Sequence, residues 1–211
     1  VPSLTVENYV KTIYLIAARA AEGGPVATGE LAQALSVSPG TVTGMLKTLS
    51  EAALATYTPY EGAALTPAGE RLALAVLRRH RLVELFLAQT LRMPWDEVHE
   101  EAEHLEHAVS DRLIDRIDAY LGHPEVDPHG DPIPRADGSL PDPGGLPLAR
   151  LEPGRRFRVT RVVDQDPAFL RYLTECGLDL GTAGTVSENR PEAGALVLRV
   201  GDRLIALGQD A

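Results

Sequence analysis

The stretch TGELAQALSVSPGTVTGMLKTLSEAAL, residues 28–54, decides the fold of the first part of the chain. Apolar residues recur at helical spacing from Leu31 to Leu35, which predicts a short helix. Ser38 followed by Pro39 then has the N-cap and first-turn chemistry of a new helix. The second helix would bury four side chains, Val42, Met45, Leu46 and Leu49. Two short helices joined by a tight turn predict a helix-turn-helix.

Both flanks of this motif carry further elements. Residues 5–21 place apolar side chains at helical spacing, and the Gly-Gly-Pro sequence that follows would end that helix. Residues 54–67 are rich in β-forming residues on either side of a Glu-Gly pair, which predicts a hairpin. A hairpin directly after a helix-turn-helix is a wing, so the sequence predicts a winged helix.

The rest of the chain divides by composition. Residues 66–91 and 94–121 have the pattern of two long helices, with a break near Met93 and a start at Pro94. Residues 122–147 are loaded with Pro, Gly and Asp, which is typical of a loop or linker. Beyond it, residues 155–163 and 194–207 alternate like strands around a short helix at 166–178. These patterns predict a small, β-rich last domain.

Composition limits the class of protein. Hydrophobic residues make up 44% of the 211 residues, but no stretch reaches the roughly 18 apolar residues of a membrane span. A lone cysteine, Cys176, excludes an internal disulfide and a cysteine-based zinc site. We therefore expect a cytoplasmic protein. The net charge of −10 disfavours nucleic-acid binding, which uses Lys and Arg, but suits the binding of cations.

The stretch HEEAEHLEH, residues 99–107, concentrates potential metal ligands. With about 100° per residue on a continuous helix, Glu103, Glu106 and His107 would fall within about 80° of His99. In the preceding helix His80 and Glu84 are four apart and share a face. Four of the six histidines of the chain lie in these two predicted helices.

Four readings of this cluster compete. The zinc-protease signature needs two histidines four apart, but after His99 the next one is His104, one place too late. A di-iron bundle needs two Glu-x-x-His pairs, and only the pair from Glu101 to His104 exists. What remains is either a solvated helix surface, the usual state of any one such residue, or a divalent metal site without catalysis. The concentration of ligands favours the metal site.

The sequence resembles the diphtheria-toxin-repressor family of iron- and manganese-dependent transcriptional regulators. The resemblance covers nearly the whole chain, and its most specific motifs are RRHRLVELFL, VHEEAEHLEHAVSD and HGDPIP. It implies a mainly α fold with a winged helix-turn-helix at 1–72 and a helical dimerisation and metal-binding domain at 73–135. A linker at 136–147 would lead to a Src-homology-3-like, ferrous-transport-protein-A-like β-barrel at 148–211.

The resemblance also implies ligands for about two divalent ions per subunit. The activating site would use Asn8, Glu103, Glu106 and His107. The ancillary site would use His80, Glu84, His99 and Asp166. Asp127 and His129 are weaker candidates, because they stand where some relatives carry a Cys-Pro-His metal segment, and an ordinary proline turn is an equal alternative there.

This chain departs from the pattern of the family at two positions. Iron-type relatives carry Met and Cys at the activating site and manganese-type relatives carry Asp and Glu, whereas this chain has Asn8 and Glu103. Lys11 stands where manganese-type relatives have an acid. With no sulfur ligand, the site favours Mn(II), and Fe(II) is the second candidate.

The family implies a homodimer that binds double-stranded DNA at a palindromic operator, without a membrane partner. Residues 1–72 are acidic overall, but residues 38–50 hold Lys47 and no acid. The expected DNA contacts are Thr28, Ser38, Pro39, Gly40, Thr41, Thr43, Gly44 and Lys47. The sequence thus predicts a metal-activated regulator of metal-uptake genes. The alternatives are a metal-dependent hydrolase or oxidase, a winged-helix regulator that needs no metal, and a winged helix that binds protein.

Overall fold

The computed structural model describes residues 3–19, 24–142 and 144–208, and these residues form two compact units. One unit comprises the described parts of residues 1–80 together with 106–109 and 134–139. The other comprises the described parts of residues 81–105, 110–133 and 140–211. The long helix α4, Pro67–Leu91, contributes to both units. No helix of the described residues is both long and apolar enough to cross a membrane.

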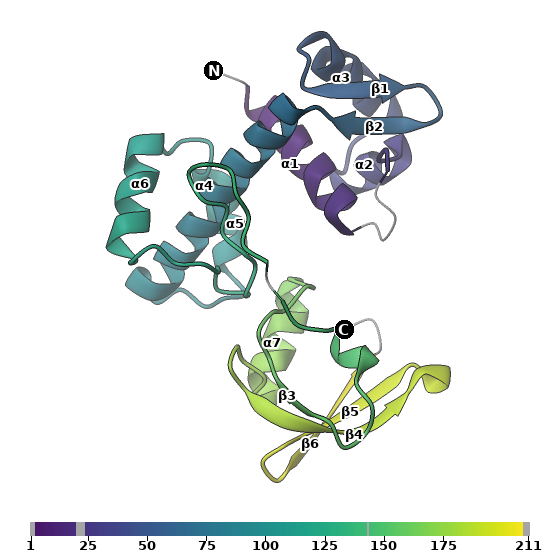
Figure 1. Cartoon of the computed structure of the whole chain (residues 1–211), viewed down its shortest axis with the longest axis vertical. Helices are drawn as coiled ribbons and strands as arrows, with labels where there is room; N and C mark the ends of the chain where they lie inside the picture. The colour runs from purple at the N-terminus through teal and green to yellow at the C-terminus, as the bar shows by residue number, and fades with distance from the viewer. Residues whose placement is uncertain (1–2, 20–23, 143, 209–211) are drawn as a thin grey trace. The chain divides into compact units, whose positions relative to one another are not determined.

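The first unit contains the winged helix (Figure 1). Its elements are α1 (Leu4–Arg19), α2 (Thr28–Ala34), α3 (Pro39–Glu51), β1 (Ala55–Thr58) and β2 (Gly62–Leu65). Ser38 caps α3 by accepting a hydrogen bond from the Thr41 amide at 3.1 Å, as its position before proline predicts. The strands β1 and β2 pair antiparallel from Ala55–Leu65 to Thr58–Gly62. The predicted helix-turn-helix and wing are therefore confirmed, while residues 20–21 of the predicted first helix lie outside the described residues.

One apolar core holds this unit together. Val10 and Ile13 of α1, Leu31 of α2, and Leu46 and Leu49 of α3 are all fully buried. Met45, predicted to be buried with them, is only partly buried against the same core. Because these side chains come from all three helices, the core fixes α3 with its opposite face exposed.

The second predicted long helix is wrong in its extent. The structure has two helices there, α5 (Val98–Leu105) and α6 (Asp111–Tyr120), separated by a turn. Ser110 begins α6, because its hydroxyl accepts a hydrogen bond from the Leu113 amide at 3.3 Å. Pro94 also starts no helix, since the residues after it form a turn closed by the Glu97 amide on the Pro94 carbonyl at 3.0 Å. The calculated stripe of ligands therefore does not continue past Leu105.

The last part of the second unit is a four-stranded antiparallel sheet packed with one helix (Figure 1). The strands run in the order β3 (Arg156–Arg158), β4 (Ala183–Arg190), β5 (Ala195–Val200) and β6 (Arg203–Gly208). The helix is α7 (Pro167–Cys176), and two 3-10 turns lie at Leu148–Arg150 and Pro191–Ala193. The core of this region includes Leu170, Val186, Leu196 and Leu198.

The expected closed barrel is wrong, because among the described residues β3 and β6 are the edges of an open sheet. The segment predicted as strand 155–163 forms β3 only at Arg156–Arg158, and its pairing along this edge ends at Val159, which bonds with Gly181 and Thr182. Its Val162 amide donates instead to the carbonyl of His129 at 2.8 Å. Gly130, at φ +86°, allows this approach, since a Cβ there would lie 2.1 Å from the Thr160 carbonyl oxygen. The sheet is thus tied to the 127–133 loop.

Candidate metal centres and nucleic-acid interface

The first candidate centre lies inside the first unit, where α1 meets the turn after α5. His107 Nε2 lies 2.6 Å from Asn8 Oδ1 and 3.0 Å from Glu106 Oε1. His107 Nδ1 lies 2.6 Å from Glu7 Oε2. The structure therefore brings together three of the four residues predicted for the activating site, Asn8, Glu106 and His107. We call them, with Glu7, Lys11 and His80, the Glu106 cluster.

The atoms of this cluster fit a cation. When the imidazole donates from Nδ1 to Glu7, the neutral ring presents the lone pair of Nε2 to two oxygen acceptors, Asn8 Oδ1 and Glu106 Oε1. An octahedral ion such as Mg²⁺, with ligands at about 2.1 Å, separates neighbouring ligand atoms by about 3.0 Å. The spacings of 2.6 and 3.0 Å around His107 Nε2 are close to that value. Three electron-pair donors at such spacing suit a divalent ion.

Glu106 is the most enclosed member of the cluster, with no exposed surface. Its Oε1 lies 2.6 Å from Lys11 Nζ and its Oε2 lies 2.7 Å from His80 Nδ1. Burial by itself would raise the pKa of Glu106, but hydrogen bonding from His80 and the charges of Lys11 and His80 outweigh it and lower the pKa. The charged form of Glu106 is therefore favoured, and its two oxygens contact Lys11 and His80.

Glu7 is a member of the cluster that sequence reasoning missed. It is 5% exposed, and its second oxygen pairs with Arg79 at 3.0 Å. The signal was present, because Glu7 lies three residues before the buried Val10 and thus on the core-facing side of an amphipathic helix. A carboxylate at such a position is buried only when it is paired.

The second candidate centre lies inside the second unit. Glu84 of α4, Asp127 and His129 are all buried, and each offers a ligand atom within 4.8 Å of the others. His129 Nε2 donates to the Trp95 carbonyl at 2.8 Å. The other ring nitrogen, Nδ1, has no hydrogen-bond partner among the described residues and lies 4.0 Å from Glu84 Oε2. A buried imidazole lone pair that faces two carboxyl groups is the arrangement of a metal ligand fixed by a backbone acceptor.

Electrostatics support this second centre. Burial and the negative charges of Glu84 and Asp131 raise the pKa of Asp127 to about 8, against the opposing charge of Arg81. Neighbouring carboxylates repel each other when no cation lies between them. A divalent ion bound here would relieve that repulsion. The predicted ancillary ligand Glu84 thus meets Asp127 and His129, which sequence analysis had assigned to a separate, weaker site.

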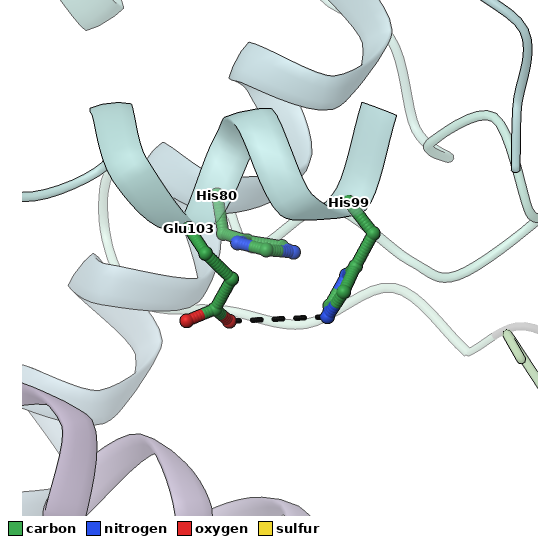
Figure 2. A group of neighbouring side chains, drawn as sticks. All are labelled: His80, His99 and Glu103. Atoms are coloured by element: carbon green, nitrogen blue, oxygen red, sulfur yellow. Dashed lines mark ion pairs between the residues drawn. The ribbon is translucent and has the colours of Figure 1, made fainter. Parts of the chain in front are cut away.

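The structure also gives the contacts of the remaining predicted ligands. His99 Nδ1 lies 3.1 Å from Glu84 Oε1, and its Nε2 forms an ion pair with Glu103 Oε1 at 3.9 Å, one turn along α5 (Figure 2). His80, also drawn in Figure 2, projects from α4. Asp166 caps α7, because its Oδ1 accepts from the amides of Ala168 at 2.8 Å and Phe169 at 3.2 Å.

The residues predicted to contact DNA lie on α2, at the start of α3 and along α3. Ser38, Pro39, Gly40, Thr41, Gly44 and Lys47 are exposed, and Thr28 and Thr43 are partly exposed. Thr28, Thr43 and Lys47 line one cleft of about 520 Å³ together with Tyr57 and Tyr60 of the wing. The wing residues were not among the predicted DNA contacts, although Tyr60 is fully exposed at the hairpin tip. Residues of α2, α3 and the wing thus line one cleft, and we call the predicted DNA contacts together with Tyr57 and Tyr60 the surface over α3 and the wing.

The structure combines a winged helix with a buried histidine and carboxylate cluster that its first helix contacts through Asn8, and this combination is typical of metal-responsive DNA-binding proteins. Three family models match the chain in order. The iron dependent repressor N-terminal DNA binding domain matches residues 3–63, its metal binding and dimerisation domain matches 66–135, and the FeoA domain matches 146–211. The chain belongs to the iron-dependent repressor family, whose members are DNA-binding transcriptional repressors and not enzymes.

Individual relatives agree with this membership. The iron-dependent repressor IdeR of Mycobacterium leprae is 32% identical over 173 residues, which cover 81% of this chain and 72% of the relative. A manganese-dependent transcriptional repressor in complex with manganese is 41% identical, with a TM-score of 0.88 over 97% of this chain and 95% of that one. The manganese regulator SloR is 31% identical, with a TM-score of 0.80 over 97% and 94%.

Proposed function

We propose that this chain is a manganese-activated repressor of metal-uptake genes, with Fe(II) as the second candidate corepressor. One divalent ion binds Asn8, Glu106 and His107, and a second binds Glu84, Asp127 and His129. Further ligands proposed from the family resemblance are Glu103 for the first ion and His80, His99 and Asp166 for the second. The similarity to a repressor solved with manganese supports the choice of metal.

The donor atoms of the two sites also favour manganese. Both sets consist of carboxylate or amide oxygen and imidazole nitrogen, with no sulfur. Oxygen-rich sites suit Mn(II) better than the softer metals, which prefer thiolate or thioether ligands. Asn8 supplies a neutral oxygen in place of a carboxylate, so the first site should bind its ion more weakly than an all-carboxylate site would.

One observation carries the proposal, the 2.6 Å approach of His107 Nε2 to Asn8 Oδ1. Asn8 belongs to α1, which directly precedes the helix-turn-helix and shares its core. When Asn8, Glu106 and His107 share a cation, α1 is held to the turn that carries the other two ligands. The ion thereby favours one arrangement of the DNA-reading helix, and its concentration becomes the signal.

The DNA partner follows from dimer symmetry. A homodimer with a two-fold axis presents two copies of α3, so it reads a palindromic operator. The helix α6 leaves Leu113 and Tyr120 exposed at 48% and 70%. They lie seven residues apart, so they share one helix face that suits contact with a second copy. We place this regulator in the cytoplasm, where its DNA target lies.

A DNA-shift assay with the region upstream of this protein's own gene tests the proposal. Mn(II), Fe(II) under anaerobic conditions and Zn(II) are compared with a chelator. We expect at least about tenfold tighter binding with Mn(II) than with the chelator, since allosteric couplings typically span about 5- to 150-fold. The variant His107→Ala should lose most of this difference because it lacks the central ligand.

The matched control is His123→Ala. The His123 side chain is 74% exposed and pairs with the nearby Asp118 at 3.0 Å, so its removal should leave the metal response intact. Equal affinity for DNA with Mn(II) and with the chelator, in the unmodified protein, would instead favour a regulator that needs no metal.

A further inference from the structure

Lys11 is a buried cation inside the Glu106 cluster. Its side chain is 8% exposed, and Nζ lies 2.6 Å from Oε1 of Glu106, which has no exposed surface. Lys11 follows Asn8 by three residues on α1, so both side chains project from the same face of that helix. Lysine is rarely buried unless it is paired, and here its partner is a proposed metal ligand.

The same oxygen faces two different partners. Oε1 of Glu106 lies 2.6 Å from Lys11 Nζ and 3.0 Å from His107 Nε2. A divalent ion at about 2.1 Å from Oε1 would therefore stand no more than about 5 Å from the ammonium group. Because the cluster is shielded from water, two positive charges at this distance repel each other strongly. The ammonium and the ion cannot both hold this oxygen without cost.

The other carboxylate oxygens of the Glu106 cluster already have partners. Oε2 of Glu106 is engaged by His80 at 2.7 Å, and Glu7, the other carboxylate of the cluster, is engaged by Arg79 at 3.0 Å. The pairing with Lys11 also explains how Glu106 keeps its charge in the protein interior, since a carboxylate is buried only when it is paired.

We infer that Lys11 is a built-in cation that competes with the divalent ion for Glu106, and that it thereby sets the metal concentration at which the protein responds. In the metal-free protein Lys11 links α1 to Glu106. When the metal-ligating residues close on an ion, that link is weakened or broken. This inference rests on the proposed function, because it assumes that Glu106 ligates a metal.

The test is calorimetric titration of the full chain with MnCl₂, using Lys11→Met. The variant should bind Mn(II) about tenfold more tightly than the unmodified protein, because the competing charge is gone. Its metal-free form should also unfold at a temperature lower by about 5 °C, since a buried charge has lost its partner. A residue with only a packing role would lower that temperature without tightening the binding of metal.

Two further variants control for charge. Arg155→Met removes one exposed positive charge outside the cluster, and Lys11→Arg keeps the positive charge, so both should bind Mn(II) as the unmodified protein does. If Lys11→Met fails to fold without metal, as judged by circular dichroism, Lys11→Gln replaces it with the same expectation, because its amide can still donate to Glu106.

Equal or weaker Mn(II) binding by the uncharged variants overturns the inference and leaves the proposed function standing. If the unmodified protein and the variants all bind no Mn(II), both the proposed function and the inference are wrong.

Discussion

At the scale of single residues, Asp127 shows how the second candidate centre couples to pH. Its folded-state pKa is raised to about 8 from an ordinary value of 3.8 by burial and by the charges of Glu84 and Asp131. Between these two values the folded protein binds a proton that the unfolded chain releases. The contribution of Asp127 to folding stability is therefore fully present below about pH 4 and is lost as the pH rises towards 8.

The variant Asp127→Asn tests this coupling in metal-free protein. Urea unfolding between pH 5 and pH 8 should show stability falling with pH by on the order of a few kcal/mol in the unmodified protein, and less steeply in the variant. Asp137→Asn is the control. Asp137 is exposed, and its hydrogen bonds with Ser139 lower its pKa. Its contribution to folding stability is therefore lost only on acidification. Identical slopes for Asp127→Asn and the unmodified protein would contradict the assignment.

The residues of the two candidate centres can be predicted from the sequence more fully than the contacts between them. Asn8, Glu106 and His107 were predicted to act together, and the structure brings them together. From the sequence, Lys11 is only a position that lacks the expected acidic ligand. Its pairing with Glu106, 95 positions away, could not be predicted from local periodicity. The joining of Glu84 with Asp127 and His129 was missed for the same reason, since an irregular loop carries two of the three residues.

At the scale of elements, the break between α5 and α6 decides where Glu106 and His107 lie. A continuous helix would have placed both on the stripe with Glu103, as the 3.6-residue period predicts. The serine at position 110 instead begins a new helix, and Glu106 and His107 lie in the turn before it. The signal for this break was a serine before an acidic first turn, which is a usual helix start but was read as part of a long amphipathic run.

Ser110→Ala should therefore destabilise the protein by about 1 kcal/mol, because the Leu113 amide loses its acceptor. For a chain of this size the melting temperature would fall by about 2–4 °C. Ser50→Ala is the matched control, since Ser50 is an exposed residue within α3 and alanine favours the helix interior. Thermal unfolding followed by circular dichroism measures both, and an unchanged transition for Ser110→Ala would show that the cap is not what fixes the turn.

At the scale of the whole molecule, the sequence predicted the parts in which local pattern and tertiary packing agree. The winged helix follows from apolar periodicity and caps, and its core residues lie where that period puts them. The sheet of the last region was less predictable. Its strand β4 buries only Val186, so it lacks an apolar alternation. The segment after β3 bonds to the 127–133 loop through the Val162 amide, a contact between distant positions that local pattern does not reveal. The domain limits at 72, 135 and 147 stay predictions.

The net charge of −10 sets how this molecule can bind DNA. Of the four cations in residues 1–72, Lys11 is buried against Glu106, and only Lys47 is exposed on α3. One or two phosphate contacts per subunit would give a metal-loaded dimer a slope of log K against log salt between about −2 and −4, at about −0.9 per contact. The remaining affinity must come from hydroxyl, aromatic and backbone contacts, which are less sensitive to salt.

Fluorescence anisotropy of a labelled operator, measured from 50 to 200 mM KCl with Mn(II) present, checks this expectation. Lys47→Met should make the slope shallower by about 2 for the dimer, because each subunit loses one phosphate contact. Arg155→Met removes a cation outside α3 and the wing and should leave the slope unchanged. A slope steeper than about −6 in the unmodified protein would mean that more cations than Lys47 reach the phosphates, and the surface over α3 and the wing would then be too small to account for DNA binding.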